Sequence, residues 1–142
     1  MRLPDWLRNT VEGVRNLAAF GPVIWEFRSW DWEHNLAIFK RSLELTEETT
    51  RLHGDHEGAE REARTMRVAI HLMDRIIRND YCKDEEQGLF DLIEVGTERW
   101  TVCLKTNTDD VLRTYKKRKQ LAKNDWEYLW KLLNKHLKHW WS

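Results

Sequence analysis

One segment of the chain carries an apolar repeat with the period of a helix. Six apolar residues recur at a strict 4-3-4-3-4 spacing, namely Ala59, Ala63, Met66, Ile70, Met73 and Ile77. Because a helix turns once every 3.6 residues, this spacing places all six on one face. Ala69, Leu72 and Ile76 widen the apolar sector on one side. We therefore predict that this helix contacts two neighbours and forms the centre of a bundle.

Two further helices are expected before this central segment. The first covers residues 1–20, where apolar residues follow a 4-3-4 spacing, and Gly21 with Pro22 is expected to end it. Residues 21–31 then form an irregular, tryptophan-rich connector. Asp31 is suited to cap the second helix, which ends in the polar run 53–58. One face of that helix carries Leu36, Phe39, Leu43, Thr46 and Thr50.

The last third of the chain contains one ambiguous segment and one long helix. Within residues 89–105, alternating apolar residues from 100 to 104 resemble a strand, but we prefer a helix because the rest of the chain is helical. Thr108 or Asp109 is expected to cap a final helix of about 30 residues, which a break at Asn124-Asp125 would shorten. Its apolar face carries Tyr115, Ala122, Trp126, Leu129, Leu133, Leu137 and Trp140.

These elements predict an all-α fold in a single domain of 142 residues. We expect a single compact bundle of four to five helices with a long C-terminal helix. Within the domain, residues 32–142 form the helical bundle that follows the first helix and the connector. A second copy of the chain could cover part of the wide apolar sector of the central helix, so a homodimer is an open alternative.

The composition narrows the function classes. With 41% hydrophobic residues, 34% charged residues and a net charge of zero, the chain is typical of a soluble globular protein rather than a nucleic-acid coat. No stretch approaches 18 apolar residues, so no membrane span is expected. Cys82 and Cys103 form no C-x-x-C motif, which predicts no zinc site and reduced thiols in an intracellular protein.

Five short motifs follow one another in a characteristic order. They are Trp30-Asp31-Trp32, His56-Glu57-Gly58-Ala59-Glu60, Arg67-x-Ala69-Ile70-x-Leu72-x-Asp74-Arg75, Trp126-x-x-Leu129-Trp130-x-x-Leu133 and Trp140-Trp141. With these motifs the chain resembles a widespread group of small helical bacteriophage proteins, mostly without assigned function. The resemblance implies a phage protein acting in the cytoplasm of an infected bacterial host, and it implies no catalytic residues.

Basic residues form a stripe on the predicted central helix. At about 100° per residue, the basic residues of this stripe fall within a sector of roughly 120°; they are Arg61, Arg64, Arg67, His71, Arg75 and Arg78. Rows of guanidinium groups bind phosphate or carboxylate groups. The alternative, which we favour, is a solvated face neutralised by neighbouring acids. The candidate residues for an anionic ligand are Arg64, Arg67, His71, Arg75 and Arg78.

The nine tryptophans favour a binding protein over an enzyme. Trp25, Trp30 and Trp32 lie in or beside the predicted connector, and Trp141 lies off the apolar face of the final helix. Tryptophans held on loops and termini are suited to a protein interface or to stacking on an aromatic ligand. They would otherwise cover the ends of the bundle.

Two other chemistries have partial support. Glu44-x-x-Glu47 and His71-x-x-Asp74 imitate the metal-binding spacing of helical nucleotide pyrophosphohydrolases of the MazG type, but a histidine replaces a carboxylate there. A further His/Asp/Glu cluster lies in residues 53–60, but no metal or cofactor is predicted. The final helix interleaves lysines with tryptophans, which would suit nucleic acid if the rings were exposed.

The function that the sequence favours is non-catalytic. We expect a phage accessory protein that binds a host component, with a host protein as the leading partner. Three alternatives stay open: sequestration of a small anionic signalling nucleotide or metabolite by an Arg/Trp site, a metal-dependent all-α nucleotide pyrophosphohydrolase, and nucleic-acid binding through the basic C-terminal helix.

Overall fold

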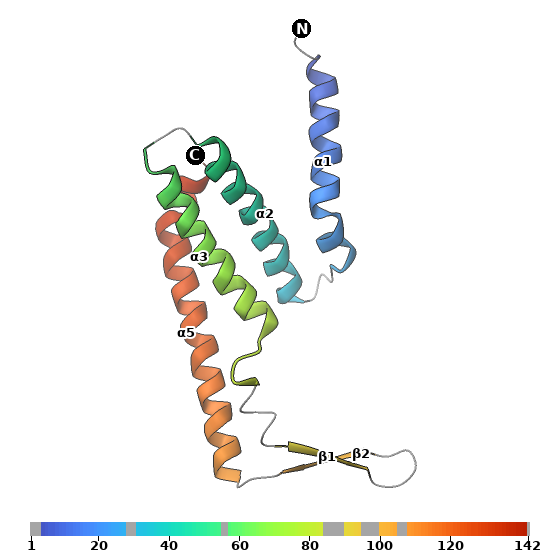
Figure 1. Ribbon diagram of the computed structural model, residues 1–142, viewed down its shortest axis with the longest axis vertical. Helices are drawn as coiled ribbons and strands as arrows, with labels where there is room; N and C mark the ends of the chain where they lie inside the picture. Colours follow the sequence, from blue (N-terminus) through green and yellow to red (C-terminus); the bar gives the residue numbers. More distant parts are fainter. Residues whose placement is uncertain are drawn as a thin grey trace.

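Three helices lie side by side and a fourth stands beside them. The computed structural model describes residues 4–27, 31–54, 57–83, 90–94, 100–104 and 108–141. Its elements are α1 (Asp5–Trp25), α2 (Trp32–His53), α3 (Ala59–Arg78), β1 (Phe90–Glu94), β2 (Trp100–Leu104) and α5 (Thr108–Trp140). In Figure 1, α3 lies between α2 and α5, and α1 lies on the outer side of α2. The hairpin of β1 and β2 lies at the end of the bundle where α5 begins, away from the C-terminus.

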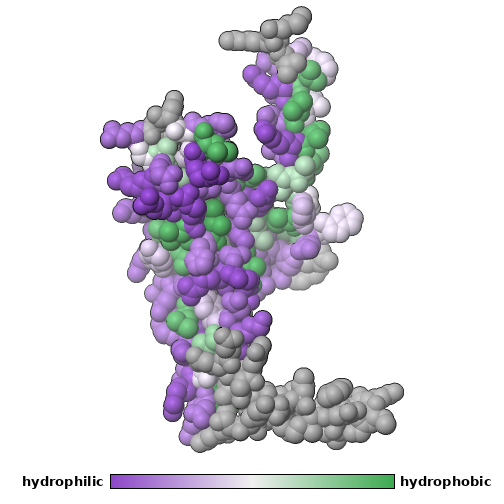
Figure 2. Space-filling model, viewed as in Figure 1, coloured by the Kyte–Doolittle hydropathy of each residue, from purple (hydrophilic) through white to green (hydrophobic). Residues whose placement is uncertain are grey.

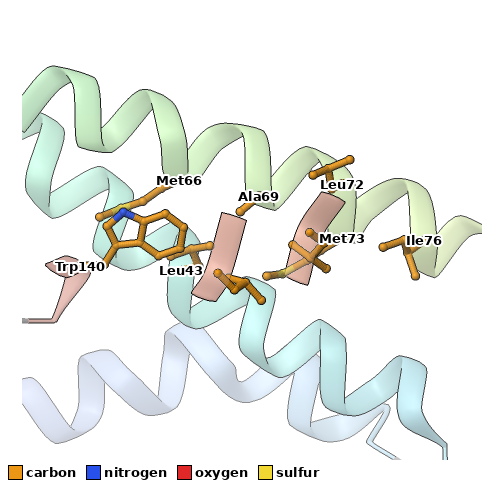
Figure 3. Close-up of a cluster of buried hydrophobic side chains, with 9 residues drawn as sticks. Leu43, Met66, Ala69, Leu72, Met73, Ile76 and Trp140 are labelled. Atoms are coloured by element: carbon orange, nitrogen blue, oxygen red, sulfur yellow. The ribbon is translucent and has the colours of Figure 1, made fainter. Parts of the chain in front are cut away.

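The core confirms the central position of α3. The helix buries seven residues, namely Ala59, Ala63, Met66, Ala69, Leu72, Met73 and Ile76. The cluster of buried residues around α3 also contains Leu43 of α2 and Leu129, Leu133 and Trp140 of α5. Figure 3 shows part of this cluster. Both sides of the apolar sector of α3 are thus used within one chain. The sector therefore offers no argument for the homodimer that it suggested.

The ends of α2 follow from local capping. The carboxylate of Asp31 accepts a hydrogen bond of 3.0 Å from the backbone N–H of Glu33, which confirms Asp31 as the N-cap. At the other end, the N–H of Gly54 donates to the carbonyl of Thr50 at 2.9 Å. Gly58 then precedes α3 with a φ of 108°, a conformation that glycine adopts without strain. The predicted break between the two helices is therefore confirmed.

Gly54 also allows a close approach between the end of α2 and the start of α3. A Cβ at this position would press against the backbone oxygen of Thr50 and lie 2.6 Å from the Cβ of Ala59. We expect Gly54→Ala to lower the free energy of unfolding by about 1.5 kcal/mol, measured by urea denaturation. Gly13→Ala is the control, because open space surrounds Gly13 in α1 and alanine favours a helix. Equal stability of Gly54→Ala and the parent would contradict this account.

The predicted end of the first helix is wrong. Helix α1 continues through Gly21 and Pro22 to Trp25. Pro22 removes only one backbone hydrogen bond, and it lies in the final turn. One turn earlier, α1 is held by the neighbouring helix, because Nε of Arg41 donates to the carbonyl of Ala19 at 3.0 Å. The connector is therefore shorter than residues 21–31.

The preference for a helix over residues 89–105 is also wrong. Strands β1 and β2 pair antiparallel, with Leu92 opposite Val102 at the centre of the register. β-Branched and aromatic residues favour strands, and the alternation over residues 100–104 carries that pattern. The coarser fold prediction is confirmed: the described residues form a helical bundle of four helices with a long C-terminal helix.

Helix α5 is unbroken over 33 residues, about 50 Å, and passes through Asn124-Asp125 without interruption. In the second half of its predicted apolar face, Leu129, Leu133 and Trp140 are buried, whereas Leu137 is exposed. Tyr115 is exposed, because the first half of α5 extends beyond the end of α3 (Figure 1).

Candidate functional site

Helix α1 exposes its apolar half. At about 100° per residue, six large apolar residues fall within a sector of about 140°. All six are exposed, from 54% for Ile24 to 88% for Trp25, and α1 contains no buried residue among those described. We call this surface the α1 apolar face; its residues are Trp6, Val11, Val14, Leu17, Ile24 and Trp25.

The polar half of α1 is turned toward α2. A groove of about 430 Å³ separates the two helices, and α1 lines it with Glu12, Arg15, Asn16 and Ala19. Figure 2 shows the same orientation, with hydrophobic atoms along the outer side of α1 and hydrophilic atoms on the side toward α2. An amphipathic helix normally buries its apolar face against the core. Helix α1 does the reverse, so its apolar face is available for another molecule.

Among the predicted interface tryptophans that the structure describes, Trp25 alone lies on this face. It closes α1 instead of lying in a connector, and Trp30 lies outside the described residues. The amphipathic spacing in α1 is visible in the sequence. The sequence could not show which half of the helix faces the bundle, and for that reason Trp6, Val14 and Leu17 were not predicted as interface residues.

Two other predicted interface tryptophans, Trp32 and Trp141, pack against the bundle. The ring of Trp32 is 5.3 Å from that of Trp126, and Trp126 is stacked on Trp130 at 6.2 Å. The ring of Trp141 lies 6.1 Å from Phe39. Trp32 and Trp141 are each about half exposed, so one side of each ring packs and the other meets solvent.

Acidic partners hold part of the predicted arginine stripe. The guanidinium of Arg67 donates to Glu47 of α2 at 2.7 Å and to Glu60 at 2.9 Å. Both hydrogen bonds raise the pKa of Arg67 above its ordinary value. Arg78 lies 2.6 Å from the carboxylate of Asp74. An anionic ligand would have to compete with these carboxylates for the same donors.

A third arginine of the stripe joins α3 to α5. Nε of Arg75 lies 3.2 Å from Oδ2 of Asp125, and the hydroxyl of Tyr81 donates to the same oxygen at 2.7 Å. The guanidinium also lies over the ring of Tyr81, 5.4 Å from its centre. Burial, and then the hydrogen bond to Asp125, raise the pKa of Tyr81. Arg64 and His71, the other two predicted residues, are exposed on α3.

The carboxylates of the hydrolase hypothesis are engaged with cations. Nζ of Lys40 donates to Asp74 at 2.8 Å and lies 3.7 Å from Glu44, which also accepts from Arg41 at 2.9 Å. The hydrogen bond from Lys40 lowers the pKa of Asp74. Glu47 accepts a hydrogen bond from Arg67 of the arginine stripe. A metal ion would have to displace these cations before it could bind.

No group of three His, Cys, Asp or Glu side chains within the described part of the chain could hold a metal ion. The predicted cluster in residues 53–60 is covered only partly, because Asp55 and His56 lie outside the described residues. The described residues therefore provide no metal-binding geometry that would support the hydrolase hypothesis.

The densest basic run of α5 lies apart from the tryptophans, whereas single lysines such as Lys123 and Lys131 lie among them. The dense basic run Lys116–Lys119 lies about 16 Å along the axis from Trp130, at 1.5 Å per residue. Trp140 is buried in the core, and Trp126 is partly buried. Stacking on unpaired bases requires exposed rings close to the cations. This geometry does not favour nucleic-acid binding.

Known proteins give no further guidance: no protein-family model, curated protein sequence or solved structure matches the chain. None of the helices in the described residues is both long and apolar enough to cross a bilayer.

Proposed function

We propose that this protein is a non-catalytic binding protein that uses the α1 apolar face to engage a protein of the infected bacterial host. The observation that carries the proposal is the orientation of α1, with its polar half toward α2 and its apolar half exposed. The bacterial host follows from the resemblance to phage proteins. The partner is thus the host protein that the sequence favours, and the principal contact surface is the α1 apolar face.

The size and chemistry of the α1 apolar face suit a protein partner. Helix α1 has 21 residues, about 31 Å, and tryptophans stand near both of its ends. An amphipathic helix of this kind inserts into an apolar groove of another protein, with aromatic side chains as anchors. A contiguous apolar surface of this extent is a typical interaction site.

The charge of α1 argues for protein over lipid. Two arginines, Arg8 and Arg15, are balanced by Asp5 and Glu12. Pairs at 3.0 Å and 3.8 Å join each arginine to one of these acids. Helices that lie on anionic membranes carry an excess of basic residues on the polar half. The polar half of α1 has no such excess.

Two acidic substitutions in the α1 apolar face test the proposal. We expect Val14→Asp with Leu17→Asp to weaken binding to the partner at least about 30-fold, since each change buries a charge in the contact. The partner is captured from bacterial lysate with the parent protein, identified by mass spectrometry and purified. Its Kd is then measured by calorimetry against both forms.

The matched control is Asn9→Asp with Asn16→Asp, which adds the same two charges to the other half of α1. We expect the control to bind like the parent, and both variants to keep the parent's circular dichroism. Equal binding by the parent and Val14→Asp/Leu17→Asp would overturn the proposal. A dimer of the parent protein that covers the α1 apolar face, measured by light scattering and absent in Val14→Asp/Leu17→Asp, would also overturn it. The same holds for binding of the parent protein to lipid vesicles that is lost in Val14→Asp/Leu17→Asp.

A further inference from the structure

A second concave site lies on the other side of the bundle, between the first half of α3 and the last turns of α5. The cavity has a volume of about 420 Å³, within the range of small-molecule sites. We call it the α3–α5 pocket, and six of its lining residues matter here: Arg61 and Glu62 of α3, and Lys135, His136, His139 and Trp140 of α5. None of them belongs to the α1 apolar face, and Arg61 alone lies on the basic stripe that the sequence predicts on α3.

The lining of the α3–α5 pocket is predominantly basic. Two permanent cations, Arg61 and Lys135, approach from different helices, and two histidines stand beside them. Glu62 is the one acid among the lining residues. The ring of His136 is stacked on that of Trp140 at 6.0 Å, with 12° between the planes, so His136 is held in place. Cations converging from two elements are the arrangement that binds a multiply charged anion.

Two properties of the lining residues point to a missing acceptor. Burial lowers the pKa of His136, and the positive charges of Lys135, His139 and Arg61 lower it further, while Glu62 opposes them. The indole N–H of Trp140 is buried and has no hydrogen-bond partner among the described residues. Buried donors in proteins are normally paired with protein, water or ligand. An anion would reduce the repulsion between the cations, and its oxygens are acceptors of the kind that the indole N–H of Trp140 lacks.

We propose that the α3–α5 pocket binds a phosphorylated small molecule, with Arg61 and Lys135 as the principal contacts and the imidazoles of His136 and His139 beside them. Phosphate offers several acceptor oxygens and up to two negative charges, which match donors arriving from both helices. A carboxylate offers only two oxygens. The volume exceeds that of a single phosphate group and leaves room for an organic part in contact with Trp140.

Calorimetric titration with inorganic pyrophosphate at constant ionic strength tests the α3–α5 pocket. We expect saturable binding, and a loss of at least about 10-fold in affinity for Arg61→Ala and for Lys135→Ala. Lys131→Ala and Lys138→Ala are matched controls, because each removes a lysine charge from an exposed position of α5 outside the pocket. Both controls should bind within about two-fold of the parent.

The pH dependence gives an independent readout. Pyrophosphate binding favours the protonated imidazole of His136, whose pKa in the free protein lies below its ordinary value, so the affinity that His136 contributes should be lost as the pH rises from about 5 to about 7. His136→Gln should remove this part of the pH profile, because the deprotonation of pyrophosphate affects both forms alike. The groups that act on His136 are Lys135 and His139 on α5 and Arg61 and Glu62 on α3. Absence of saturable binding would overturn the proposal, as would an equal loss in the Lys131 and Lys138 controls. Citrate binding as tightly as pyrophosphate would overturn the assignment of phosphate.

Discussion

Replacing Leu129 with alanine should lower the free energy of unfolding by about 3 kcal/mol, within the range of about 2–5 kcal/mol for such substitutions. Leu129 is fully buried at the centre of the contact between α5 and α3, in the same cluster as Met66 and Met73. The helical backbones restrict the collapse of neighbouring side chains into the space that is left. Loss of transfer free energy is therefore joined by the cost of a cavity.

Urea denaturation monitored by circular dichroism measures the loss at Leu129. The control is Tyr128→Ala, which removes a larger side chain from the adjacent, exposed position of α5 and should change stability by about 0.5 kcal/mol or less. A similar loss in both variants would contradict the packing of α5 described here.

Asp125→Ala should cost about 3 kcal/mol, for an electrostatic reason. The carboxylate of Asp125 is 13% exposed and accepts from the hydroxyl of Tyr81 while it pairs with Arg75. Its removal leaves a buried hydroxyl without an acceptor and a guanidinium without its counter-charge. Because these contacts join the end of α3 to the middle of α5, the loss should be much larger than at an exposed acid.

The control for Asp125 is Glu127→Ala, two residues along the same helix. Glu127 is more than half exposed and lies 3.7 Å from Lys123, a pair that contributes about 0.5 kcal/mol or less. The combination of Asp125→Ala with Tyr81→Phe should cost less than the sum of the two single changes, because both remove the same hydrogen bond. Strict additivity in urea denaturation would contradict the network.

The bundle was predictable where a local pattern repeats over many turns. The apolar spacing of residues 59–77 identified α3, its central position and its two neighbours, because amphipathic periodicity reports directly on burial. Asp31 was predictable as a cap for the same reason, since its hydrogen bond is local. The hairpin was not, because in a short segment the pairing of two strands outweighs the helical context of the chain.

The candidate sites depended on distances between helices, which the sequence does not contain. The stripe on α3 was visible, yet only the approach of Glu47 from α2 and of Asp125 from α5 showed where its arginines donate. The approach of Lys135 to Arg61 is likewise invisible, because 74 positions separate them in the chain.

The sequence established that α1 has one apolar half and one polar half, since that property follows from helical periodicity alone. It could not establish which half faces α2. That choice rests on long-range contacts such as the hydrogen bond from Arg41 to the carbonyl of Ala19, which anchors α1 by its polar side. Periodicity is a property of one helix, whereas orientation is a relation between two, and for this reason only the folded chain reveals the exposed face.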